Sequence, residues 1–326
     1  MTDAVVVVGG GISGIACARE LAAAGVPVRV LDRGRRVGGR MAVRTVDGHA
    51  VDTGASYFTV SDPAFAAVAE DWQRRGLARP WTDTFAVASS EGIGESKSGP
   101  MRWAGTHGLR SLVEDLAAGL DVVTDRTVAS VAPGSVDGEP AAAVVLAMPD
   151  PQARRLGAPL APDAAEYTPA LVLAAGFAAR TWVALDAAFV NDDVTVLRTP
   201  KEEPFPITFL ADDGRRRGDD APVLVAHSNA ALAREHLADP SAAAAVMLDS
   251  VRRLTGVREE PLWSFVHRWT YAQPSSTRDE PWHLSDDLVG LCGDGWSDRP
   301  RVEAAYLSGR GLGLELASRL AGSAGR

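Results

Sequence analysis

The chain has 326 residues, which leaves room for about two domains of ordinary size, each with a sizeable core. Hydrophobic residues make up 46% and charged residues 23% of it, and this balance excludes a disordered tail and a membrane protein. The net charge of -9 has the wrong sign for holding a nucleic acid backbone.

Neither the cysteines nor the apolar stretches indicate a disulfide, a metal site or a membrane segment. Cys17 and Cys292 lie far apart in the sequence and follow no ligand spacing, so we expect neither a disulfide framework nor a metal site. No basic segment followed by a long apolar run begins the chain, and no apolar stretch is long enough to span a bilayer. We therefore expect a cytoplasmic protein without a membrane partner.

The first residues predict the start of a parallel sheet. Residues 4–8 form an apolar β-branched strand, residues 9–14 are rich in glycine, residues 15–24 predict a helix ended by Gly25, and residues 26–31 predict a second strand. This strand, turn, helix and strand indicate an α/β fold with a Rossmann-like, doubly wound sheet.

The following elements alternate less regularly. We predict a helix over residues 63–76, a loop or hairpin over 89–99, a helix over 108–118, and strands over 121–123, 128–131 and 143–147. Strands at 171–175, 181–185, 194–197, 207–210 and 223–227 predict a second, mixed or antiparallel sheet, and the chain closes with a strand at 288–292 and a helix at 302–320. Residues 212–220, with three arginines between aspartates, predict a solvated hairpin tip without function.

A dinucleotide motif lies between the first strand and the first helix. Gly9, Gly11 and Gly14, with Ile12 and Ser13 between them, form G-x-G-x-x-G, in which glycines let the backbone approach a diphosphate at a helix N-terminus. Asp32 follows the second strand, where a carboxylate binds a ribose diol and repels a 2'-phosphate. Together these residues predict a bound dinucleotide.

A second glycine pair indicates a flavin rather than a nicotinamide. In the run from Val37 to Met41, Gly38 and Gly39 allow close passage beside the cofactor, and Arg40 supplies a cation to the diphosphate. We count Arg33, Gly39, Arg40 and Met41 among the cofactor contacts, while some of the neighbouring arginines fit a solvated surface equally well.

These features and several later segments carry a family resemblance. The chain resembles the flavoproteins of the amine oxidase superfamily, and within it the renalase family and its bacterial members, over its whole length. The matching segments are residues 9–14, 38–40, 52–58, 143–149, 224–227, 267–271 and 293–295. The resemblance implies the fold of these proteins and FAD as the cofactor.

The resemblance also assigns cofactor contacts beyond the first motif. Gly54 and Ala55 are small enough to pass beside a flavin ring, with Tyr57 and Phe58 as apolar walls or simply as core residues. Asp294 would accept hydrogen bonds from the ribityl hydroxyls, and the helix from Val302 would direct its positive end at the flavin. The remaining implied cofactor contacts are Val128 and Pro149.

The same resemblance divides the chain into two parts. We predict an FAD-binding domain from residues 1–60, 101–150 and 262–326, and a substrate domain from residues 61–100 and 151–261. Gly309, Gly311 and Gly313 have no strand before them, so there is no second dinucleotide domain and the substrate must dock directly onto the flavin.

The substrate side of the site is predicted from histidine and aromatic residues. His227 ends a strand, and Trp269 and Tyr271 alternate on one face of another; the resemblance places a matching histidine and tryptophan at the flavin face. We predict His227 and Trp269 as catalytic residues. The predicted substrate contacts are Tyr57, His227, Trp269, Tyr271 and Trp296.

The resemblance implies a specific reaction. A renalase-like oxidase converts the 2- and 6-dihydro isomers of NAD(P)H to NAD(P)+ and passes the electrons to O2, which yields H2O2. Ser56 and Thr270 depart from the residues usual in the family, so the physiological substrate stays open. The alternatives are a flavin amine oxidase or desaturase acting on another small molecule, and a flavin-binding protein without turnover.

Overall fold

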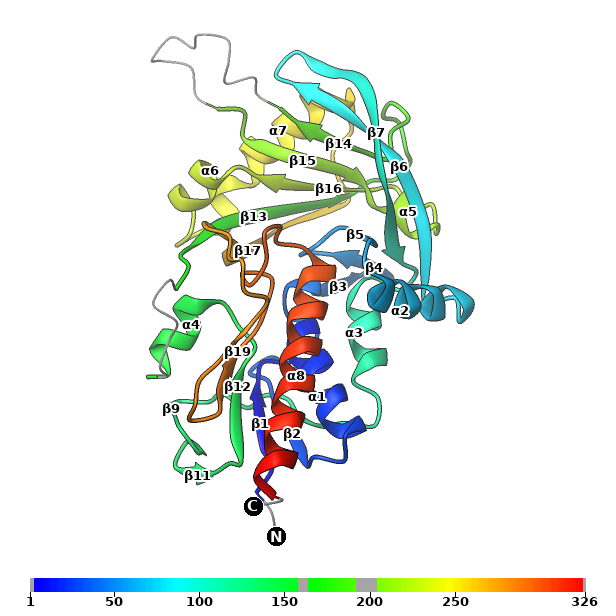
Figure 1. Ribbon diagram of the computed structural model, residues 1–326. Helices are drawn as coiled ribbons and strands as arrows, with labels where there is room; N and C mark the ends of the chain where they lie inside the picture. The colour runs from blue at the N-terminus through cyan, green and yellow to red at the C-terminus, as the bar shows by residue number, and fades with distance from the viewer. Residues whose placement is uncertain (1–2, 158–163, 192–203, 325–326) are drawn as a thin grey trace.

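Two large sheets organise the protein (Figure 1). The computed structural model describes residues 3–157, 164–191 and 204–324. A six-stranded sheet contains the N-terminal strand, and an eight-stranded sheet lies at the opposite end of the molecule, with the chain termini far from it (Figure 1).

The six-stranded sheet is parallel except at one edge. Its order is β18-β19-β12-β1-β2-β8, and only β18 runs antiparallel to its neighbour. The valine-rich strands β1 and β12 are almost entirely buried, as is typical of parallel strands covered on both faces. The strands are β1 (Val5–Val8), β2 (Val28–Leu31), β8 (Asp121–Val123), β12 (Ala143–Leu146), β18 (His283–Leu284) and β19 (Val289–Leu291).

Different elements cover the two faces of this sheet. Helices α1 (Ile12–Ala23), α3 (Arg110–Leu116) and α8 (Val302–Ala324) bury one face. A three-stranded sheet of β9 (Val131–Ala132), β10 (Ser135–Val136) and β11 (Glu139–Pro140) lies in the connection from β8 to β12 and helps to bury the other. The predicted Rossmann-like α/β fold is confirmed.

Helices α1 and α8 lie side by side in close contact (Figure 1). A Cβ on Gly309 would lie 1.8 Å from the backbone oxygen of Ser13, and one on Gly313 would lie 2.6 Å from that of Cys17. Gly309 and Gly313 of α8 therefore let the backbones of the two helices approach, whereas Gly311 makes room for the Trp282 ring.

The eight-stranded sheet is mixed, as the sequence predicts. Its order is β17-β13-β16-β15-β14-β6-β7-β5, and all neighbouring pairs are antiparallel except β14 with β6. The strands are β5 (Phe58–Thr59), β6 (Ala78–Ser89), β7 (Gly92–Gly105), β13 (Tyr167–Gly176), β14 (Ala187–Val190), β15 (Ile207–Asp212), β16 (Val223–Ser228) and β17 (Trp263–Pro274).

Short elements complete the described chain. Helix α7 packs on one face of the eight-stranded sheet, and the β3–β4 hairpin leads into the segment between β4 and β5. These elements are η1 (Gly39–Met41), β3 (Val43–Val46), β4 (His49–Asp52), α2 (Pro63–Arg74), α4 (Asp150–Arg155), α5 (Asp213–Arg217), α6 (Ala230–Glu235), η2 (Pro240–Ala243) and α7 (Ala244–Thr255). No helix in the described part of the chain combines the length and apolar character needed to cross a bilayer.

Several predicted boundaries are wrong. Residues 181–185 form no strand, and the chain becomes extended only from Ala187. Of residues 128–131 only Val131 begins a strand. For residues 89–99 the hairpin alternative is confirmed, because they belong to the β6–β7 hairpin. The predicted strand at 194–197 lies outside the described residues.

The prediction for residues 212–220 is wrong in a way that matters for function. Residues 213–217 form helix α5, capped by the Asp212 side chain, which accepts from the Arg215 amide. Asp213, Arg216 and Arg217 are buried rather than solvated. The buried charges pair with one another and with Asp52 of β4, so this part of the segment is an internal polar cluster.

The division into domains stays a proposal. Strand β17 pairs with β13 over most of its length and so belongs to the eight-stranded sheet. We therefore propose that a boundary drawn along the sheets would assign residues 263–274 to the substrate side, whereas the sequence placed them with the FAD-binding part.

Candidate flavin site

The N-terminus of α1 offers a cradle for a diphosphate. Gly11 is the N-cap of α1, no side chain caps this end, and the first turn carries no acidic residue. A Cβ on Gly14 would lie 2.0 Å from the backbone oxygen of Gly9, so only glycine allows this tight turn. A Cβ on Gly11 would meet no heavy atom within 4 Å, and this open side leaves space for a ligand beside Ile12 and Ser13.

Asp32 lies directly beside this turn. Its carboxylate accepts from the amide N of Gly10 and of Gly34, each at 2.6 Å. The loop is thereby held against β2, and the remaining lone pairs of the carboxylate stay free to accept from a ribose diol. Arg33 is exposed at the surface.

Arg40 and Asp294 form one ion pair. Two nitrogens of Arg40 contact the two carboxylate oxygens of Asp294, at 2.5 and 2.8 Å, and Arg40 also donates to the backbone oxygen of Ala272 at 3.0 Å. Burial lowers the pKa of Arg40, but the carboxylate beside it outweighs burial and raises that pKa. The structure thus brings two predicted cofactor contacts together, 254 positions apart in the chain.

The segment between β4 and β5 lies against this pair. A Cβ on Gly54 would lie 1.9 Å from the backbone oxygen of Arg40 and 3.4 Å from a ring carbon of Trp269. The amide of Ala55 donates to the same Arg40 oxygen at 2.9 Å, and the indole N–H of Trp269 donates to the backbone oxygen of Thr53 at 2.5 Å. Trp269 of β17 in the eight-stranded sheet therefore fixes the backbone at Thr53 and Gly54, the segment predicted to pass beside the flavin.

Tyr57 and Phe58 point to different places. Phe58 is buried in the core, where its ring stacks on Trp103 with the ring centres 6.0 Å apart. Tyr57 is half-buried and lies edge-on to Phe85, with the ring centres 5.4 Å apart. The rings around Tyr57, here called the aromatic wall, are Trp81, Phe85, Phe189 and Phe209.

His227 stands at the junction of the aromatic wall and the segment from Gly54. Its ring lies edge-on to Phe209, with the ring centres 5.4 Å apart, and its Nε2 lies 3.4 Å from Oγ of Ser56. Burial and the nearby cation of Arg216 lower the pKa of His227 to about 4. His227 is therefore neutral at physiological pH, so it can form hydrogen bonds through its ring nitrogens but lacks the acidic proton of an imidazolium.

The other predicted contacts lie around the periphery of this arrangement. Tyr271 is half-buried and pairs with Arg155, whereas buried Trp296 stacks on His283 and lies under the Arg278 guanidinium. The remaining three occupy the surroundings of the six-stranded sheet: Val128 in its buried second face, Pro149 as the N-cap of α4, and Val302 as the first residue of α8.

Helix α8 begins with a buried acid. Glu303 accepts from the backbone N–H of Ser61 at 2.6 Å and of Asp62 at 2.8 Å. Its negative charge lies in the first turn and offsets part of the positive end of the helix dipole. The same carboxylate also pairs with Arg301 at 2.9 Å, and the electrostatic role of this helix end toward a flavin stays a prediction.

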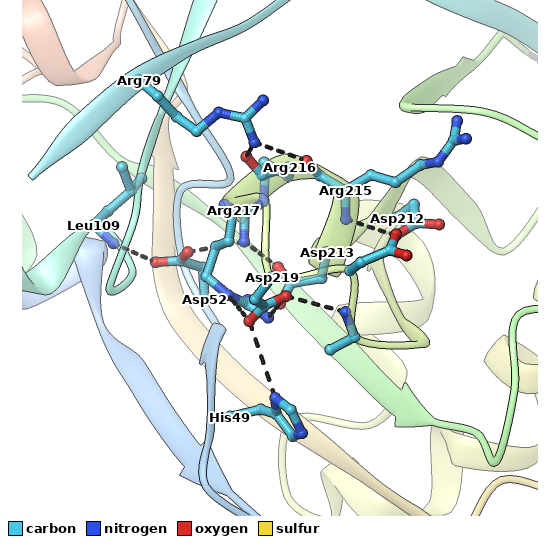
Figure 2. Close-up of polar contacts among 12 residues, drawn as sticks. His49, Asp52, Arg79, Leu109, Asp212, Asp213, Arg215, Arg216, Arg217 and Asp219 are labelled. Carbon is cyan, nitrogen blue, oxygen red and sulfur yellow. Dashed lines mark hydrogen bonds and ion pairs between the residues drawn. The ribbon is translucent and has the colours of Figure 1, made fainter. Parts of the chain in front are cut away.

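Sequence reasoning missed two buried arginines, Arg216 and Arg102, that lie beside His227 and the aromatic wall. Arg216 of α5 donates to Asp52 and Asp213 (Figure 2). It also donates to the backbone oxygen of Ser56. Arg102 of β7 is buried, donates to the backbone oxygen of Asp83 at 2.6 Å and lies 3.9 Å from the ring centre of Phe85. The aspartate-flanked arginine run at 212–217 was the available signal, because a capped helix with matched charges can be buried.

The residues present fit a flavin dinucleotide. The open face of Gly11 at an uncapped helix end suits the diphosphate, and Asp32 suits the ribose. Gly293 has φ +150° and open space at its Cβ position, so the backbone beside Asp294 also leaves room for a ligand. These features come from β1, β2 and β19, whose carboxyl ends share one edge of the parallel sheet.

Comparison with known proteins agrees with this class. Residues 7–72 match the model of an NAD(P)-binding Rossmann-like domain, and residues 74–311 match the model described as flavin-containing amine oxidoreductase. The fold and site define a flavin-dependent oxidoreductase. The chain belongs to the flavin-containing amine oxidoreductase family.

Two curated relatives match over segments of different length. Hydroxyneurosporene desaturase of Rubrivivax gelatinosus is 46% identical over 69 residues, which are 20% of this chain and 13% of the desaturase. Polyamine oxidase 1 of Oryza sativa subsp. japonica is 36% identical over 130 residues, 38% of this chain and 22% of the oxidase. The matched segments thus span less than a quarter of these relatives.

Solved structures match over nearly the whole chain. Cyclohexylamine oxidase from Brevibacterium oxydans IH-35A has a TM-score of 0.73 at 15% identity, covering 98% of this chain and 100% of that one. Putrescine oxidase bound to putrescine has a TM-score of 0.69 at 15% identity, with 98% and 100% covered. At these identities the likeness establishes the shared fold.

Proposed function

We propose that the protein is an FAD-dependent oxidase that converts 2- and 6-dihydro isomers of NAD(P)H to NAD(P)+, with O2 reduced to H2O2. The balance is one dihydronicotinamide, one O2 and one proton giving one NAD(P)+ and one H2O2. FAD, when bound, supplies a two-electron acceptor that O2 can reoxidise.

The observation that carries this proposal is the charge beside the aromatic wall. Arg216 lies behind His227, and Arg102 lies over Phe85 and beside Tyr57. The buried carboxylates Asp52 and Asp213 are both bonded to Arg216. Buried cations disfavour a substrate that binds as an ammonium, whereas a dihydronicotinamide ring carries no charge when it binds.

The side chains at the site suit a reaction driven by orientation. Oxidation of a dihydronicotinamide yields an aromatic pyridinium, so little acid or base catalysis is needed. Trp269, fixed by its bond to the Thr53 carbonyl, and neutral His227 would orient the substrate ring against the flavin side of Gly54. We assign both residues as substrate contacts and as the residues on which turnover depends.

The other predicted contacts take secondary places in this proposal. Tyr57 would close the pocket through the aromatic wall, and Tyr271 would lie at its outer edge beside Arg155. Trp296 is stacked between Arg278 and His283, so we assign it to the support of the loop that carries Asp294 rather than to the substrate.

A second candidate is oxidation or desaturation of another small molecule. The names of the similar proteins favour it, since they include a polyamine oxidase, a putrescine oxidase and a desaturase. An amine enters such a site as its neutral form or pairs with an acid, so amine turnover here would rise steeply with pH.

The test is anaerobic mixing of the purified yellow protein with a nicotinamide preparation that contains the 2- and 6-dihydro isomers. Rapid loss of the oxidised flavin absorbance, followed by one H2O2 per turnover after air is admitted, supports the proposal. Ordinary 4-dihydro NAD(P)H serves as the matched control. A flavin that these isomers leave oxidised, but that putrescine or cyclohexylamine bleaches, overturns it in favour of amine oxidation.

A further inference from the structure

The Arg216 side chain joins two segments that are distant in sequence, its own helix α5 and residues 52–56. It is 1% exposed, and its Nη2 donates to Asp52, the last residue of β4, at 2.8 Å, and to Asp213 within its own helix. Its Nη1 donates to the backbone oxygen of Ser56. The cluster around it, drawn in Figure 2, comes from β4, α5 and the segment beside α3.

Asp52 is held from a second side. Its other carboxylate oxygen accepts from the Leu109 amide at 2.8 Å, at the start of α3 (Figure 2). Burial raises the pKa of Asp52, and Arg216 opposes that rise. An acid buried with both oxygens bonded fixes the end of β4, because any shift would leave a buried charge without a partner.

Arg217, the next residue, provides a contrast within the same helix. It is also buried, and it pairs with Asp213 and with Asp219 at 3.1 Å. Among the described residues, its side-chain hydrogen bonds stay within residues 213–219, so Arg217 stabilises the α5 turn itself. Arg216 alone of the two reaches the segment that runs along the predicted flavin wall.

We propose that Arg216 is a positioning residue of the flavin site, whose guanidinium clamps residues 52–56 at both ends and thereby sets the flavin-facing path of Gly54 and the approach of Ser56 to His227. This inference rests on the proposed function only in placing the flavin beside Gly54. The clamp acts on residues that touch the cofactor or substrate, through Asp52 and the Ser56 carbonyl.

The clamp has an electrostatic consequence for His227. Facing the His227 ring are Arg216 from α5, Ser56 from the wall segment, Phe209 from β15 and Val172 from β13. Asp52 and Asp213 stand behind Arg216 and are bonded to it. Burial is the larger cause of the low His227 pKa, and the cation of Arg216 adds to it by disfavouring a second positive charge.

The test uses two charge-balanced double variants. Arg216→Gln with Asp52→Asn removes the clamp while keeping an amide that can accept from Leu109. Arg217→Gln with Asp219→Asn removes one arginine and one aspartate from the same cluster but leaves the clamp intact. Arg216→Lys keeps the charge, but a single ammonium cannot span Asp52 and the Ser56 carbonyl with the geometry of the guanidinium fork.

Two readouts distinguish positioning from mere structural support: the pKa of His227 from NMR titration of the imidazole, and the dissociation constant of FAD from quenching of its fluorescence. We expect the clamp variant to raise the His227 pKa by a unit or more and to weaken FAD binding at least tenfold, with the Arg217 variant like wild type in both. We expect Arg216→Lys to weaken FAD binding while the His227 pKa stays low.

The proposal is overturned if the clamp variant folds and matches the Arg217 variant in both measurements. If the clamp variant does not fold, Arg216→Lys decides, since FAD binding equal to wild type overturns the clamp and a tenfold loss supports it. Neither measurement uses turnover, so failure of the dihydronicotinamide reaction would leave this result unaffected.

Discussion

The Ser56 hydroxyl lies 3.4 Å from Nε2 of His227, although the two residues are 171 positions apart in the chain. Ser56 belongs to the segment that crosses the predicted flavin wall, and His227 belongs to β16 in the eight-stranded sheet. The contact therefore joins the cofactor side to the substrate side at one point. A change at either residue is expected to alter how a substrate is oriented rather than whether the protein folds.

Replacement of His227 by alanine is expected to slow flavin reduction by about 10²-fold, since the neutral imidazole orients the substrate ring and transfers no proton. The FAD content of the purified variant should equal that of wild type. Anaerobic stopped-flow absorbance measures the first quantity and the visible spectrum the second. His236→Ala, at the end of α6, is the control. Complete loss of reduction with FAD still bound would show that His227 takes part in the chemistry itself.

The buried imidazole predicts an acid-sensitive stability. The pKa of His227 falls from 6.5 to about 4 through burial and Arg216, so between these values the unfolded chain binds a proton that the folded chain does not. Stability is therefore complete above pH 6.5 and is lost as the pH falls toward 4, by at most about 3 kcal/mol.

The measurement is urea unfolding of wild type and His227→Gln at pH 7.5 and about pH 4.5. We expect the variant to lose less stability between the two pH values than wild type does. Equal losses in both proteins would mean that His227 is not the group responsible, and that the carboxylates dominate the acid response.

The contact between α1 and α8 predicts opposite effects for two glycines of one helix. Gly309→Ala places a Cβ where the Ser13 oxygen lies 1.8 Å away, so α8 must shift and we expect a loss of about 1–3 kcal/mol together with weaker FAD retention. Gly322→Ala meets nothing within 4 Å and should add about 0.5–1 kcal/mol. Thermal unfolding with and without added FAD measures both. A neutral Gly309→Ala would contradict the close contact.

The ion pair of Arg40 and Asp294 predicts a cofactor phenotype. Asp294→Ala removes the acceptor for ribityl hydroxyls and leaves Arg40 without its carboxylate, so the FAD dissociation constant should rise about 10- to 100-fold, equivalent to about 1.5–3 kcal/mol. Fluorescence titration with FAD measures this constant. Asp298→Ala, exposed four residues further on, should bind FAD like wild type. Equal affinities in the two variants would remove Asp294 from the cofactor contacts.

Local sequence predicted the parts of the fold that depend on neighbours in the chain. The β1 strand, the turn from Gly9 to Gly14 and the start of α1 follow from apolar β-branched residues and from glycines without Cβ atoms. Strand β8 begins and ends where predicted, since residues 121–123 are a short apolar run between turns. The strand predicted at 181–185 is wrong. The apolar residues that suggested a strand lie in a loop, where Trp182 packs into the core.

The sequence by itself determined the glycine turn between β1 and α1, the two sheet types and the family, because these depend on glycine geometry, periodicity and motif spacing along the chain. Only the tertiary structure decided that Arg216 and Asp213 are buried, that Asp294 pairs with Arg40, and that Ser56 meets His227. An arginine flanked by aspartates has the same local preference on a surface as in a core. Its burial depends on partners such as Asp52, 164 positions away, which supply the compensating charge.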